Sequence, residues 1–140
     1  MDYPTVDLAY LRAITDCTGI IQHGTHSIPN RRLGYTTDDN ARALLVAVQS
    51  YEMTGDRADL DLAMVYLSFI HHAQNPRGLY SNVMSFQREF LDEDGTEDCL
   101  GRTMWACGTT ASSQLPANTK VVAKTLFEES IGHAVKMRSP

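Results

Sequence analysis

The stretch Thr37-Asp38-Asp39-Asn40-Ala41-Arg42 has the composition of a helix start. Threonine is a common helix-capping residue, and acidic residues are stabilised at the positive end of the helix dipole. Apolar residues then follow with helical spacing as far as Tyr51, and Gly55 supplies the usual stop. The sequence therefore predicts a helix over residues 38–54, capped by Thr37.

The same signature recurs about sixty residues later as Thr96-Glu97-Asp98-Cys99-Leu100-Gly101-Arg102, with one residue of slippage between the copies. In each copy an arginine follows an aspartate by four residues, so that the two share one helix face. Each copy also follows a long loop and opens the first helix of a pair. Repeated helical hairpins of this length are typical of solenoids and toroids. We therefore expect stacked hairpins whose first helices begin at the same end of the domain.

Apolar periodicity and capping residues predict four further helices. They cover residues 5–15 with Thr5 as cap, 56–75, 96–111 with Thr96 as cap, and 118–137 with Asn118 as cap. Glycines and a proline make residues 16–36 a long loop, and residues 79–86 have the pattern of a short extended piece or a small hairpin. The prediction is one mainly α domain over residues 1–140. It consists of antiparallel helical hairpins in a partial (α/α) toroid of about five helices.

Composition excludes several classes of protein. A net charge of -5, with Arg31-Arg32 as the only close basic pair, argues against nucleic-acid binding. No apolar run approaches the ~18 residues that span a membrane, and no secretory signal is visible. Cys99 and Cys107 would lie roughly 12 Å apart along a helix, too far for a disulfide. Reduced thiols and a cytoplasmic location are expected.

Carboxylates, arginines and aromatic residues are expected to converge where the helix starts and the long loops meet. Asp38, Asp39 and Asp98 are the candidate catalytic residues, because paired carboxylates hydrolyse glycosidic bonds at separations of roughly 6.5–9.5 Å or 5–5.5 Å. The candidate substrate-binding residues are His23, His26, Arg32, Tyr35, Arg42, Tyr80, Glu97, Arg102 and Trp105. The alternative is that the acidic residues only stabilise the helix starts. A helix N-terminus also favours the carboxylate anion, which suits a base or a ligand-binding group better than a general acid.

No metal or cofactor site is expected. Cys17, His23 and His26 do not have a standard zinc spacing, and no phosphate-binding or dinucleotide-binding glycine motif is present. His71 falls on the apolar stripe of its helix and is expected to be a packed core histidine. Gly101 inside a helix predicts a close packing contact.

Two stretches resemble a bacterial family of carbohydrate-active helical domains related to six-hairpin (α/α) toroid glycosidases, whose members occur beside or fused to glycosyltransferases. The resembling stretches are residues 28–44 and 97–106. The resemblance implies sugar binding at the rim, with Asp38, Asp39 and Asp98 as its acidic residues. A full toroid needs about twelve helices, so this chain would supply about half of one. Uncovered helix faces would then favour self-association.

The functional expectation is a carbohydrate-active domain. It would be either glycoside hydrolase-like or a sugar-binding accessory of a glycosyltransferase. The alternative is a helical-repeat protein-interaction module without catalysis.

Overall fold

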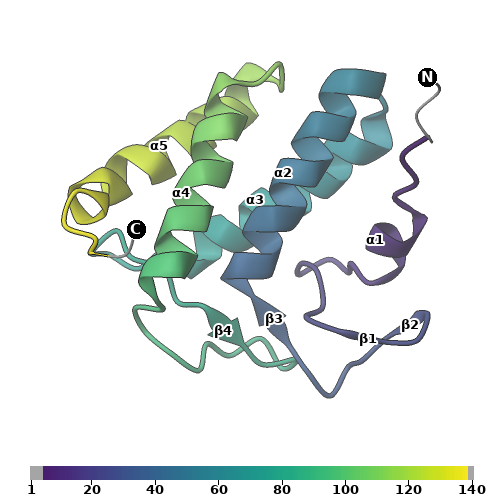
Figure 1. Cartoon of the computed structure of the whole chain (residues 1–140), viewed down its shortest axis with the longest axis horizontal. Helices are drawn as coiled ribbons and strands as arrows, with labels where there is room; N and C mark the ends of the chain where they lie inside the picture. The colour runs from purple at the N-terminus through teal and green to yellow at the C-terminus, as the bar shows by residue number, and fades with distance from the viewer. Residues whose placement is uncertain (1–4, 139–140) are drawn as a thin grey trace.

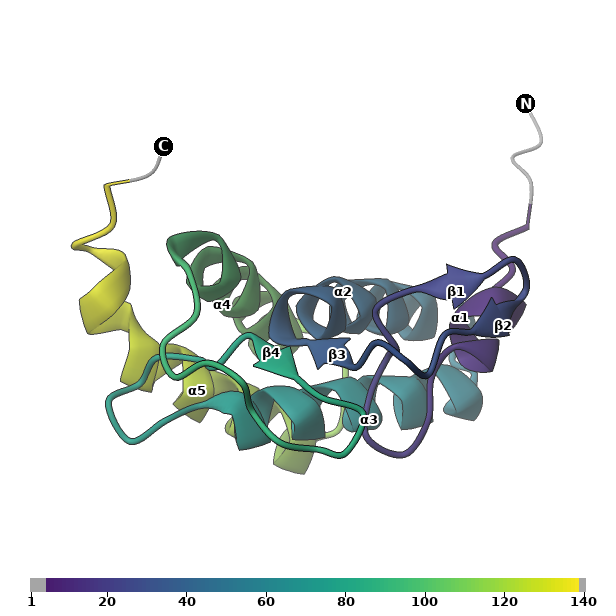
Figure 2. The same cartoon turned by 90° about the horizontal axis from the view of Figure 1, so that it is seen from below.

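The computed structural model describes residues 5–138, and two helical hairpins form its body. The first consists of α2 (Thr37–Thr54) and α3 (Arg57–Ala73), and the second of α4 (Glu97–Ser112) and α5 (Ala117–Ala134). Helices α2 and α4 lie side by side in one layer, and α3 and α5 form a second layer behind them (Figure 1, Figure 2). The prediction of a mainly α fold is confirmed.

The core lies between the two layers of helices. On α2 the fully buried residues Ala41, Leu44 and Val48 recur at helical spacing, and they form one face that packs against α3 and α4. The opposite faces of α2 and α4 are turned away from α3 and α5 (Figure 2). We call this surface of the two helices the free face.

The cap of α2 is Thr36 and not Thr37 as predicted. Thr36 has an extended backbone, and its Oγ1 accepts a hydrogen bond from the Asp39 N–H at 3.1 Å. The Thr37 hydroxyl instead donates to the carbonyl of Ser81 at 2.5 Å, which ties the helix start to the second long loop. Thr96 caps α4 as expected, by accepting from the Cys99 N–H.

The repeat therefore has no slippage. With Thr36 as the first cap, Thr36 and Thr96 are 60 residues apart, as are Asp38 and Asp98, and Arg42 and Arg102. The two helix starts therefore share their capping threonine, an aspartate and an arginine at equivalent positions, whereas Asp39 corresponds to Cys99.

Three predicted helices are shorter in the structure, among them α3, which covers Arg57–Ala73 where residues 56–75 were predicted. Helix α1 covers Ala9–Ala13 only, because the chain leaves the helix at Thr15, which forms a β-bridge with Ile20. Asp7, and not Thr5, accepts a backbone hydrogen bond at its start. Helix α5 begins one residue before Asn118, has no side-chain cap and ends at Ala134, three residues before the predicted end.

The two long loops contain four short strands. In the first loop β1 (Gly24–Thr25) pairs antiparallel with β2 (Ile28–Pro29). The strand β3 (Tyr35–Thr36), which leads into α2, pairs antiparallel with β4 (Val83–Met84) from the second loop. This pairing holds both loops at the end of the molecule where α2 and α4 begin (Figure 1).

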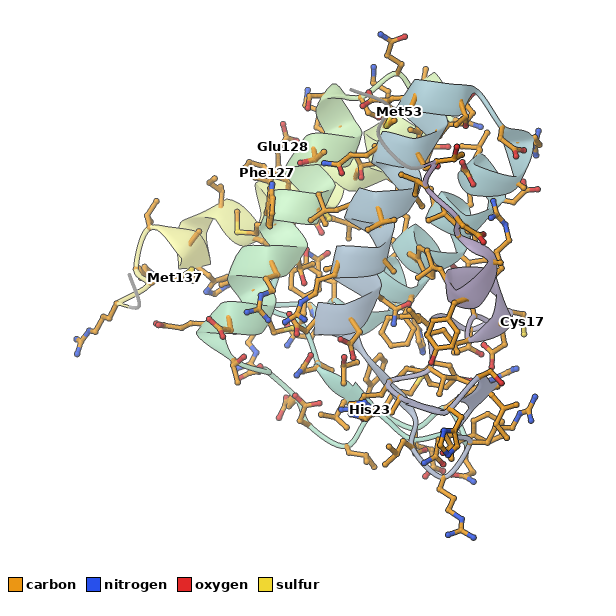
Figure 3. All side chains as sticks on the ribbon, turned by 45° about the vertical axis from the view of Figure 1, so that its right-hand side comes forward. Cys17, His23, Met53, Phe127, Glu128 and Met137 are labelled. Carbon is orange, nitrogen blue, oxygen red and sulfur yellow. The ribbon has the colours of Figure 1, made fainter. Side chains whose placement is uncertain are left out.

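The three cysteines are free thiols, and they differ sharply in exposure. Cys17 is exposed beside α1 (Figure 3), whereas burial raises the pKa of both Cys99 and Cys107 to about 12. Only thiolates react with disulfide reagents, so buried neutral thiols are inert.

We expect an aromatic disulfide reagent at pH 8 to modify one thiol in the folded protein and three in denaturant. A folded Cys17→Ser variant should release no chromophore, and rapid labelling of that variant would contradict the burial of the other two thiols.

Candidate functional site

The starts of α2 and α4 meet through one ion-pair cluster. The carboxylate of Asp38 accepts two hydrogen bonds from Nη1 of Arg102, at 2.8 Å and 2.9 Å. Arg42 approaches the same carboxylate at 3.1 Å from one turn along α2. Asp38 raises the pKa of Arg102 above its ordinary value, by hydrogen bonding and by charge attraction. Asp38 therefore joins the two hairpins and carries two guanidinium partners.

Asp98 faces the same cluster but is much more accessible. Its side chain is 73% exposed, and its nearest cationic atom is Nη2 of Arg102 at 3.7 Å. Because one planar guanidinium contacts both Asp38 and Asp98, their nearest oxygens lie within about 10 Å of each other. The structure thus brings together two of the three acidic residues that the sequence singled out.

Asp39, the third acidic residue, is partly used by the helix cap. Its Oδ2 accepts from the Thr36 hydroxyl at 2.7 Å, and its backbone N–H donates back to that hydroxyl. Asp39 and Arg42 also line a pocket of about 210 Å³ on the side of α2 that faces α1.

The free face carries exposed residues at helical spacing on both helices. On α4, Asp98, Arg102 and Trp105 are separated by four and three residues, and so they form one stripe. The indole of Trp105 is 64% exposed. Because Arg102 reaches Asp38, this stripe lies beside α2, whose own exposed stripe includes Arg42 and Val46.

Tyr35 and Tyr80, which we expected to offer flat faces to a ligand, do not do so. Each is 1% exposed. The Tyr35 hydroxyl donates to Asp16 at 2.5 Å, and burial together with this carboxylate raises the pKa of Tyr35 to about 12. The Tyr80 hydroxyl lies within hydrogen-bond distance of Gln74 and Ser130, and burial raises its pKa. Both rings support the loops from inside.

The candidate histidines and Arg32 form no hydrogen bond or ion pair with the acidic cluster among the described residues. His23, His26 and Arg32 are exposed on the first long loop, around the β1–β2 pair. Figure 3 shows His23 beyond the start of α2, at the opposite end from Met53. His71 is exposed and not a core residue as predicted, because the stripe of α3 that packs inward runs through Leu67 and Ile70. Among residues 5–138 no group of three or more histidine, cysteine or acidic side chains could hold a metal ion.

Two further contacts complete the surroundings of α4. The carboxylate of Glu97 accepts from the backbone N–H of Arg138 at 3.2 Å. A Cβ added at Gly101 would lie 3.4 Å from the methyl group of Met137, in agreement with the close contact expected there. The segment after α5 therefore packs across the first turns of α4.

Sequence reasoning missed the aliphatic wall of the pocket beside Asp39. Leu11, Ile14, Ile20 and Ile21 form this wall, with Gln22 next to them. The adjacent isoleucines inside an otherwise polar loop were the one available signal, since a loop seldom carries such a pair unless the pair is covered.

Comparison with known proteins adds no assignment. No family model matches the chain, and no curated protein matches it either. Within the described residues, no helix is both long and apolar enough to cross a bilayer.

Proposed function

We propose that this chain is a carbohydrate-binding domain whose ligand lies across the free face of α2 and α4. The main support is the stripe on α4, where the exposed Trp105 lies on the same helix face as Arg102 and Asp98. Aromatic faces pack against the apolar faces of sugar rings, while carboxylates and guanidinium groups bind hydroxyls. The resemblance of residues 28–44 and 97–106 to carbohydrate-active helical domains supports the same ligand class.

The cluster favours binding over hydrolysis. A glycosidase needs one carboxyl group that keeps its proton and delivers it to the leaving oxygen. Asp38 has two arginine partners, so its carboxylate oxygens are engaged within the protein and do not face a leaving group. Asp39 and Asp98 remain the acidic groups that can face a ligand. The role we propose is that of a sugar-binding accessory to a cytoplasmic glycosyltransferase.

The single tryptophan makes the proposal directly testable. Because the chain has only one Trp, its fluorescence reports on position 105 alone. A panel of oligosaccharides is titrated into the wild-type protein while its tryptophan fluorescence is recorded. Binding to the Trp105→Ala variant, which lacks this fluorescence, is measured by calorimetry. We expect a saturable fluorescence change in the wild type. Loss of the stacked ring should weaken binding about tenfold, corresponding to ~1.4 kcal/mol.

Matched carboxylate variants locate the site and test catalysis. Asp98→Asn and Asp39→Asn should weaken binding, whereas Asp61→Asn, on the exposed side of α3, should not. The same saccharides are assayed for new reducing ends. Equal affinity in all four proteins would remove the acidic cluster from the site. Hydrolysis that is lost in Asp98→Asn would replace the binding function with an enzymatic one.

The second candidate is a protein-interaction module that associates with itself. Exposed apolar side chains on and directly after helix α5 favour this candidate. They are Val121, Val122 and Ile131 on the helix and Val135 directly after it. Sedimentation equilibrium over a hundredfold range of concentration tests it. A concentration-dependent mass that Val121→Lys abolishes would support self-association, and a constant monomer mass would exclude it.

A further inference from the structure

The pocket beside α2 has an aliphatic interior and a polar margin. Leu11 from α1, Ile14 directly after that helix, and Ile20 and Ile21 from the following loop form the interior wall. Three of these four side chains are less than a tenth exposed: Ile14, Ile20 and Ile21. The hydrogen bond from the Ile20 N–H to the side chain of Asn40 holds the loop against α2 and keeps the wall in place.

The size of the pocket limits what it can hold. Its volume of about 210 Å³ lies below the ~300–1,000 Å³ that is usual for drug-sized ligands. A cavity of ~150 Å³ lined by aliphatic and aromatic side chains holds one benzene ring. The pocket therefore suits one six-membered ring or one substituent of a larger ligand.

The lining indicates the chemistry of that group. Leu11, Ile14, Ile20, Ile21, Gln22, Asp39, Arg42, Ala43 and Val46 make up the lining, and it contains no aromatic ring. Burying a methyl group against an aliphatic wall is favourable. Burying a hydroxyl there is unfavourable, because the hydroxyl loses its hydrogen bonds to water and gains no partner. At the margin, the amide of Gln22 and the carboxylate of Asp39 can bind hydroxyls that remain near solvent.

Charge at the margin disfavours an acidic ligand. Arg42 is paired with Asp38 at 3.1 Å, and Asp39 adds a second carboxylate next to it. These carboxylates would repel an anionic sugar, whereas a neutral sugar can donate its hydroxyls to them.

We propose that this pocket is a subsite for a neutral sugar that carries a methyl group, either a 6-deoxyhexose or an N-acetylated sugar. The inference rests on the proposed function, because Asp39 and Arg42 belong both to the pocket and to the edge of the free face. The methyl group enters the aliphatic interior, and the ring hydroxyls face the polar margin.

The test compares sugars that differ by one hydroxyl or one acetamido group. L-Fucose is compared with L-galactose, and N-acetyl-D-glucosamine with D-glucose, because neither control sugar carries a methyl group. Methyl NMR of the isoleucine-labelled full chain is recorded together with the indole N–H signal of Trp105. We expect shifts of the Ile14, Ile20 and Ile21 methyl signals with one methyl-bearing sugar. Its affinity should be about fivefold or more above that of its partner, and the pair that responds identifies the source of the methyl group.

Val46→Phe provides the matched blocking variant. Val46 lines the pocket and is 41% exposed, so a larger ring is expected to fill the mouth without disturbing the core. It should abolish the preference for the methyl-bearing sugar, and Val121→Phe, on the exposed side of α5, should leave that preference intact.

The possible results separate the two proposals. Shifts at the indole without shifts at the isoleucines, or equal affinities within both pairs, would overturn the subsite and leave the proposed function standing. Isoleucine shifts without an indole response would support the subsite alone. If neither the indole signal nor the isoleucine methyl signals shifted with any sugar, both proposals would be overturned.

Discussion

The Gly34→Ala variant is expected to lose about 3 kcal/mol of unfolding free energy, a large part of the stability of a domain of this size. Gly34 precedes β3, where the chain passes directly over the backbone of β4. A Cβ at this position would overlap the carbonyl oxygen of Met84 and come within 2.8 Å of its carbonyl carbon. Backbone atoms cannot rotate away as a side chain can, so the β3–β4 pair would have to separate. Urea denaturation followed by circular dichroism measures the loss.

Gly132→Ala is the matched control, because it makes the same substitution in open space. Nothing lies within 4 Å of a Cβ at this position, which is inside α5. Alanine favours a helix over glycine by about 0.5–1 kcal/mol, so the control should be equally stable or slightly more stable than the wild type. If both variants unfolded at the wild-type urea concentration, the close approach of Gly34 to β4 would be wrong.

The sequence predicted the helices well where local signals agree. Gly55 ends α2 in the left-handed conformation, with φ of 67°, and Asp56 caps α3 by accepting from the Ala58 N–H. Such signals depend on residues within one turn, and the sequence contains all of them. The choice between Thr36 and Thr37 as cap was different. Both threonines can cap, and the carbonyl of Ser81, 44 residues away, decides the outcome by engaging Thr37.

The sequence predicted which residues belong to the candidate site better than it predicted the contacts between them. The i,i+4 spacing predicted Arg42 beside Asp38 and Arg102 beside Asp98, and both pairs are present. The tightest pairing is nevertheless between Arg102 and Asp38, from different hairpins. Only the packing of α2 against α4 creates that pair, so spacing along one helix could not reveal it.

The burial of the two loop tyrosines has a similar long-range cause. Tyr35 pairs with Met84 in the β3–β4 ladder, and its ring lies 6.0 Å from that of Phe69 on α3. Tyr80 forms a β-bridge with Gln74 and bonds across to α5. An aromatic residue in a polar loop is predicted to be exposed unless its distant partners are known, and these partners lie as many as 50 residues away along the chain.

Replacing Arg12 is the second change for which we expect a large effect. Its guanidinium is ion-paired with Asp59, whose side chain is 4% exposed and whose carboxylate also accepts from the hydroxyl of Ser50 at 2.6 Å. In an Arg12→Met variant the carboxylate would remain buried with hydroxyl partners alone. Removing one partner of a buried pair typically costs 3–5 kcal/mol, and because the Arg12 side chain is 38% exposed we expect about 2–4 kcal/mol. Urea denaturation measures this loss too.

A double variant separates the charge from the packing. Arg12→Met with Asp59→Leu removes both charges and leaves an apolar contact between α1 and α3, so it should recover most of the lost stability. Arg57→Met is the control on the same helix as Asp59, because Arg57 pairs with Asp61 on the exposed surface and its loss should be barely measurable. If Arg12→Met were as harmless as Arg57→Met, Asp59 would have to reach solvent in the folded protein. Recovery in the double variant would instead show that the loss in Arg12→Met comes from leaving the Asp59 carboxylate buried without a cationic partner.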